Sequence, residues 1–73
     1  MRLIDVFAHN LKAVRLKRHV SQESLASRVH LSAAYISMLE RGHRSPPFQT
    51  IESLAKALDV EAVSLLSGAG RRR

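Results

Sequence analysis

The sequence predicts an all-α protein, a compact bundle of five helices in a single domain. Apolar residues recur at helical spacing in several segments, and serines stand where helices would begin. No segment shows the strict apolar–polar alternation of a strand, and no internal repeat is visible. A chain of 73 residues buries only about 60% of the surface that it exposes when unfolded, so a partner subunit would add stability.

The first predicted helix covers residues 4–18, because its apolar residues are spaced by three, four and three positions: Ile4, Phe7, Leu11 and Val14. The second helix begins at Gln22, since the hydroxyl of Ser21 can accept a hydrogen bond from a backbone N–H of its first turn. We expect Leu25, Ala26 and Val29 on its buried side.

Ser32 repeats this capping chemistry, and the third predicted helix covers residues 33–41, ended by Gly42 in a left-handed conformation. Pro46 and Pro47 forbid continuation but suit the first turn of a fourth helix. Its buried face holds four apolar residues: Ile51, Leu54, Ala55 and Leu58. A short last helix covers residues 62–66. We therefore expect one domain over residues 1–67 and a basic, disordered tail over residues 68–73.

The net charge of +6 is unevenly placed along the chain. Residues 1–44 carry a net charge of +5, residues 45–70 carry −2, and Arg71, Arg72 and Arg73 add +3. A basic half of this kind favours a polyanionic partner, although a basic surface can also simply keep a protein soluble. The absence of cysteine, of a signal peptide and of a long apolar run leads us to expect a cytoplasmic protein.

Several function classes find no support in the residues. The histidines, His9, His19, His30 and His43, lack the spacing of a helical metal site, and no cofactor or small-molecule site is evident. No phosphate loop, nucleophile elbow or pair of carboxylates indicates an enzyme. Phe7, Tyr35 and Phe48 are the only aromatic residues, and with two of them expected in the core a stacking platform for single strands is not predicted.

Residues 22–41, "QESLASRVHLSAAYISMLER", resemble the helix-turn-helix of the phage-repressor type, found in the Cro/C1 or XRE family of transcription regulators. The resemblance covers about residues 7–66. The family includes regulators such as restriction-modification controller proteins. Its motif positions are Gln22, Leu25, Ala26, Val29, Leu31, Ile36 and Leu39. It implies a lambda-repressor-like fold and a partly buried ion pair between Arg15 and Glu40. His30 and His19 depart from the family, which usually has glycine at these positions. At His30 the turn of that family needs a positive φ, so we expect one there.

With Ile36, Leu39 and Glu40 turned inward, the opposite side of the third helix is the stripe that this family inserts into the major groove. The stripe and its margin comprise Ala33, Ala34, Tyr35, Ser37, Met38 and Arg41. Within the helix no side chain can make a bidentate contact to a base, so we expect weak direct reading and a larger contribution from DNA shape. The expected contacts to phosphates are Gln22, Ser32, Lys17, Arg18, His43 and Arg44, with the three C-terminal arginines as a flexible anchor.

Four apolar residues near the C-terminus suggest a dimer interface: Val60, Val63, Leu65 and Leu66. Leu65 above all can instead complete the core of the monomer. The function that we predict is a homodimeric, sequence-selective regulator that binds a pseudo-palindromic operator in double-stranded DNA and blocks or recruits RNA polymerase. The alternative is an antitoxin or adaptor whose main partner is another protein, such as a cognate toxin, with DNA binding secondary.

Overall fold

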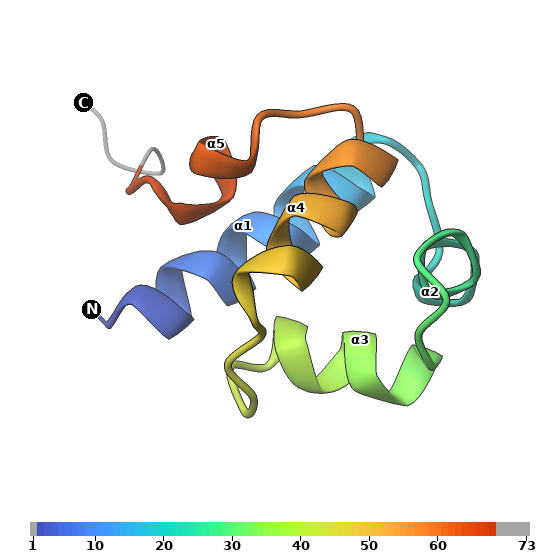
Figure 1. Cartoon of the computed structure of the whole chain (residues 1–73), viewed down its shortest axis with the longest axis horizontal. Coiled ribbons are helices and arrows are strands. Elements are labelled where there is room, and N and C mark those ends of the chain that lie inside the picture. Colours follow the sequence, from blue (N-terminus) through green and yellow to red (C-terminus); the bar gives the residue numbers. More distant parts are fainter. Residues whose placement is uncertain (1, 69–73) are drawn as a thin grey trace.

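The structure is a computed structural model that describes residues 2–68. These residues form five helices and no strand, which confirms the predicted fold class (Figure 1). The helices are α1 (Leu3–Lys17), α2 (Gln22–Arg28), α3 (Ala33–Glu40), α4 (Phe48–Ala57) and α5 (Ala62–Leu66). The predicted tail lies largely outside the described residues, and Arg71, Arg72 and Arg73 lie entirely outside them. No helix in the described part of the chain is long and apolar enough to span a membrane.

The starts of α2, α3 and α4 follow the local sequence. The hydroxyl oxygen of Ser21 accepts a hydrogen bond from the N–H of Ser24 at 2.9 Å, and that of Ser32 accepts one from Tyr35 at 3.0 Å. Both bonds are the predicted serine caps. Pro47 is the N-cap of α4, in an extended conformation that its ring allows.

Four helices end in the same way, with a left-handed residue just after the helix. In each case the N–H of the following residue returns to the carbonyl that lies five positions earlier, as in the bond from Leu31 to Ala26 at 2.9 Å. The left-handed residues are His19 (φ 58°), His30 (φ 60°), Gly42 (φ 74°) and Asp59 (φ 60°). The expected positive φ at His30 is confirmed, and Asp59 adds a position that we did not predict.

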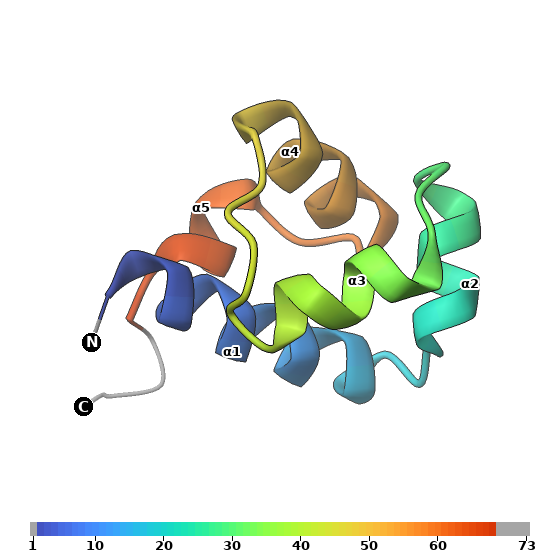
Figure 2. The same ribbon diagram turned by 90° about the horizontal axis from the view of Figure 1, so that it is seen from below.

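The core lies between α1, α3, α4 and α5, and α2 closes one end of it (Figure 2). Its largest fully buried side chains are Phe7, Leu11, Leu25, Ile36, Leu39, Leu54, Leu58 and Leu65. The expectation that two of the three aromatic side chains are core residues is wrong. Tyr35 is half-buried and Phe48 is 80% exposed, because Phe48 is the first residue of α4 and α4 buries its Ile51, Leu54 and Ala55 side instead.

Candidate nucleic-acid interface

The corner between α2 and α3 fixes the angle of the two helices. α2 ends at Arg28, His30 reverses the chain in the left-handed region, and Ser32 already caps α3. The two helices cross steeply in both views (Figures 1 and 2). Ala26, which is buried at this crossing, has no side chain beyond Cβ and so lets the helices approach closely. The corner therefore determines which side of α3 faces outward.

The inner and outer sides of α3 differ sharply in burial. Ile36 and Leu39 are fully buried, whereas Ala34 and the C-cap residue Arg41 are exposed. The other residues of the predicted stripe are half-buried: Ala33, Tyr35, Ser37 and Met38. Of these, Ala33 and Tyr35 rest partly against the core. The outer side of α3 is therefore not packed into the interior, and it is available to a partner.

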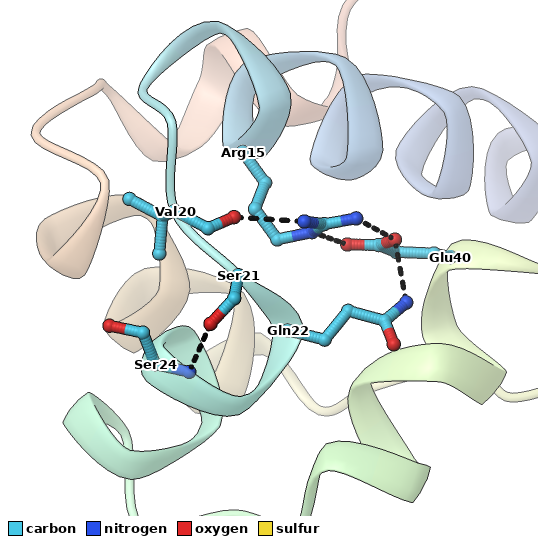
Figure 3. A network of polar contacts seen from close by, with 6 residues as sticks. All are labelled: Arg15, Val20, Ser21, Gln22, Ser24 and Glu40. Carbon is cyan, nitrogen blue, oxygen red and sulfur yellow. Dashed lines mark hydrogen bonds and ion pairs between the residues drawn. The ribbon is translucent and has the colours of Figure 1, made fainter.

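A buried polar network joins α1, α2 and α3 behind this outer side (Figure 3). The Arg15 guanidinium donates to both carboxylate oxygens of Glu40, from Nε at 2.5 Å and from Nη2 at 3.0 Å, and these side chains are only 8% and 2% exposed. Nη1 of Arg15 also donates to the carbonyl of Val20 at 2.8 Å. The ion pair that the family resemblance implied is thereby confirmed. The hydrogen bonds to Glu40 raise the pKa of Arg15 above its ordinary value, which keeps the guanidinium charged.

Gln22, an expected phosphate contact, belongs to the same network. Its Nε2 donates to Oε1 of Glu40 at 3.1 Å, and its side chain is half-buried at the first position of α2 (Figure 3). One of the two hydrogens on this amide nitrogen is therefore already used within the protein, and the other remains for a further acceptor.

Cationic and hydroxyl side chains flank α3 along the chain. The side chains of Arg41, His43 and Arg44, at and just after the end of α3, are exposed and form no hydrogen bond or ion pair with any described residue. The Lys17 side chain is exposed and without such a partner as well, but it lies at the end of α1. Ser32 is exposed at the start of α3, and its hydroxyl can still donate because the cap uses only the oxygen as an acceptor. These side chains can neutralise or bind the phosphates of a nucleic acid.

Arg18, another expected phosphate contact, differs from them because its side chain has a partner within the protein. Its Nη2 donates to the backbone carbonyl of Asp59 at 3.2 Å, so the guanidinium caps the turn between α4 and α5. Arg28, expected to be a solvated charge, makes a similar contact with the carbonyl of Ala57 at 3.4 Å. Both arginines lie against the negative end of α4, where cations are stabilising.

The predicted dimer surface on α5 also needs correction. Leu65 is fully buried in the core of the monomer, so it cannot face a second copy. Val60 and Leu66 are half-buried and pack partly against the core, whereas Val63 is 74% exposed. The exposed part of the candidate interface is therefore centred on Val63.

Sequence reasoning missed the residue that holds α5 in place. The side-chain nitrogen of Asn10 in α1 lies within hydrogen-bond distance of three carbonyl oxygens at the end of α5, those of Ser64 (3.3 Å), Leu65 (3.0 Å) and Ser67 (2.8 Å). More than fifty residues separate Asn10 from these carbonyls, and no local pattern in the sequence signals such a contact. In residues 2–68 no three His, Asp or Glu side chains gather as a metal site requires.

Comparisons with known proteins agree with this geometry. Residues 11–65 match the helix-turn-helix family HTH_3. The chain is 40% identical over 62 residues to the control protein C.BamHI of Bacillus amyloliquefaciens, covering 84% of this chain and 76% of that protein. It is 32% identical over 56 residues to the immunity repressor protein of Bacillus phage phi105, covering 77% of this chain but only 39% of the repressor.

A solved structure shares the arrangement of the helices. The restriction-modification controller protein C.AhdI from Aeromonas hydrophila superposes with a TM-score of 0.81 at 35% identity, and the match covers 85% of this chain and 94% of that chain. The family match spans well over half of the present chain and includes the α2–α3 corner and both partners of the buried ion pair. The chain therefore belongs to the XRE-type helix-turn-helix family of DNA-binding transcription regulators.

Proposed function

We propose that this protein is a sequence-selective regulator that binds a pseudo-palindromic operator as a homodimer, with α3 in the major groove of each half-site. The observation that carries the proposal is the outer side of α3, which is not packed into the interior, with the exposed side chains of Arg41, His43 and Arg44 at its end. Two copies related by a two-fold axis would place their α3 helices about 34 Å apart, one turn of DNA.

Recognition within α3 is weak in this proposal. Ala33 and Ala34 offer methyl groups that suit the C5-methyl of thymine, Ser37 can bind almost any base edge, and Met38 gives apolar contact only. Base selection then falls to Arg41 and Arg44, helped by the width and flexibility of the groove. The C-terminal arginines, outside the described residues, would add non-specific phosphate contacts.

The names of the relatives indicate which genes to test first. C.BamHI is a control protein and C.AhdI a restriction-modification controller protein. We therefore propose that the chain controls genes of a restriction-modification system, where it blocks or recruits RNA polymerase in the cytoplasm. Selection of bound fragments from random duplex DNA would reveal whether a preferred site exists and whether it is a palindrome.

A salt titration of DNA affinity tests the proposal directly. Three or four phosphate contacts per subunit predict a log–log slope of about −5 to −8 for the dimer, since each contributes about 0.9. Arg44→Ala removes one cation per subunit and should flatten the slope by about 2. Gln22→Ala removes a neutral donor, so it should lower the affinity at every salt concentration without changing the slope. Lys56→Ala is the matched control, because Lys56 is exposed on α4 and was not placed at the interface.

The scarcity of polar groups on the outer side of α3 favours a second candidate function. In this alternative the main partner is another protein, for example a toxin, bound through the surface around Val63. A slope near zero in the salt titration would favour this alternative. Sedimentation of the wild type and of Val63→Asp separates the two uses of that surface, because the homodimer requires the variant to become monomeric.

A further inference from the structure

Glu40 receives hydrogen bonds from two other helices through a single oxygen atom. Its Oε1 accepts from Nη2 of Arg15 in α1 at 3.0 Å and from Nε2 of Gln22 in α2 at 3.1 Å (Figure 3). The ion pair with Arg15 is complete without Gln22, because Oε2 already accepts from Nε of Arg15. The bond to Gln22 is thus an additional feature, and it fixes a half-buried side chain at the first position of α2.

This bond also sets the orientation of the Gln22 amide. A carboxylate can only accept hydrogen bonds, so it selects the nitrogen end of the amide. In Figure 3 the nitrogen of Gln22 is directed to Glu40 and its oxygen is turned away. The second hydrogen on that nitrogen is then held in a defined direction. Arg15 balances the charge of Glu40, so an anion that approaches Gln22 does not meet an uncompensated carboxylate.

We propose that Glu40 is a positioning residue for DNA binding: it holds the Gln22 amide so that one N–H binds Glu40 while the other binds a phosphate of the duplex. This inference rests on the proposed function. The physical gain is pre-organisation, because a glutamine that is already fixed loses less conformational freedom on binding than a free one. A carboxylate acceptor on one N–H also polarises the amide and strengthens the bond that the other N–H makes.

The wild-type protein allows a first test by NMR of its side-chain amide protons. The chain has two glutamines. Gln49 is exposed on α4, and its side chain forms no hydrogen bond with any described residue, so it is the internal control. In the free protein one Gln22 amide proton should be shifted downfield and exchange more slowly than those of Gln49. On saturation with a duplex that carries the selected site, this proton should keep its shift and the second Gln22 proton should move.

Two results in this test would overturn the inference. Gln22 protons that match those of Gln49 in the free protein would mean that Glu40 does not hold the amide. Loss of the downfield shift on DNA binding would mean that the phosphate replaces Glu40 instead of sharing the amide with it.

A second test maps the effect onto one phosphate. Duplexes in which single phosphates are replaced by uncharged methylphosphonates identify the contact of Gln22, because the effect at that position disappears in Gln22→Ala. In wild type this replacement should lower the affinity about tenfold, the size of one charge-assisted hydrogen bond. In Arg15→Met/Glu40→Leu, which removes both buried charges together and so avoids an unpaired one, the effect at this phosphate should shrink to less than about threefold.

The other phosphates provide the control in this mapping. Their effects should be unchanged in the double variant if Glu40 acts through Gln22. If the effects at all phosphates shrink equally in the double variant, the pair only maintains the fold. If the effect at the Gln22 phosphate is unchanged, Glu40 is not needed. Either result refutes the inference about Glu40 and leaves the proposed function intact. A wild-type chain that binds no duplex refutes the proposed function itself, together with the DNA half of this inference.

Discussion

Removal of one member of the Arg15–Glu40 pair should cost far more stability than removal of both. Glu40→Leu leaves the Arg15 guanidinium, 8% exposed, without its carboxylate partner. An uncompensated buried charge costs about 3–5 kcal/mol. The whole domain has a free energy of unfolding of roughly 4–11 kcal/mol at 0.05–0.15 kcal/mol per residue. The single substitution therefore removes a large fraction of the stability, and a weakly stable domain would unfold.

The double variant Arg15→Met/Glu40→Leu should recover most of this loss. Two apolar side chains of similar volume fill the site without desolvating a charge, which is often neutral for stability. The bond from Arg15 to the Val20 carbonyl is lost, so we expect a net cost of about 1–2 kcal/mol. Urea unfolding followed by circular dichroism measures all three variants on the same scale.

The exposed pair Arg2–Asp5 is the control for this comparison of the single and double variants. Its Nε–Oδ2 distance is 3.3 Å, but the side chains are 76% and 40% exposed. Asp5→Asn should leave the urea midpoint unchanged, because an exposed ion pair is screened by solvent. The reasoning is refuted if Glu40→Leu costs less than about 1 kcal/mol, or if the double variant is as unstable as the two single losses added together.

The pair should add no pH dependence near neutrality from its arginine. Hydrogen bonding to Glu40 raises the pKa of Arg15. Stability from a raised pKa is fully present below the unfolded value and is lost only as the pH rises through the folded value. For an arginine both values lie far above neutral, so the urea midpoint should show no Arg15 titration between about pH 6 and 9.

Three further substitutions test separate parts of the fold. His30→Gly should raise the stability by about 0.5–1 kcal/mol, because His30 has φ 60° and glycine adopts this conformation without steric cost; a lower melting temperature would contradict this. Gly42→Ala should lower it by about 1–2 kcal/mol, since the residue has φ +74° and the new Cβ would lie 3.3 Å from Oδ1 of Asp5; calorimetry measures both changes. Phe48→Ala should change the unfolding free energy by less than about 0.5 kcal/mol, against about 3–5 kcal/mol for Phe7→Ala, and a large loss at Phe48 would show that its ring is not solvated.

The parts of the fold that depend on local chemistry could be predicted from the sequence. Ser21 and Ser32 cap helices because their hydroxyls reach an N–H three residues later, a contact that needs no information from elsewhere in the chain. The buried stripe of α4 follows from apolar spacing alone. The left-handed conformation of His30 was expected from the family resemblance, because glycine usually stands at this position.

The sequence could not settle the environment of side chains that depend on distant parts of the chain. Phe48 lies at the start of α4, where hydrophobicity predicts burial but no other helix covers the ring. The sequence left Leu65 open between an interface and the core of the monomer, and the structure decides for the core, because α1 and α4 close over it. Arg18 stays a predicted phosphate contact, and only the folded structure shows that its side chain also reaches the end of α4.

The two sides of α3 have different roles: the inner side packs against the core, and the outer side carries few polar groups. A helix of eight residues is not stable alone, so α3 depends on packing, and Ile36 and Leu39 supply it from the inner side. Small outer residues such as Ala34 then let the helix backbone approach the floor of a groove closely. Arg41 and Arg44 follow the helix, where packing does not restrict them. In the proposed complex, specificity would be concentrated at the end of α3, because these arginines can make the bidentate base contacts that the residues on its outer side cannot make.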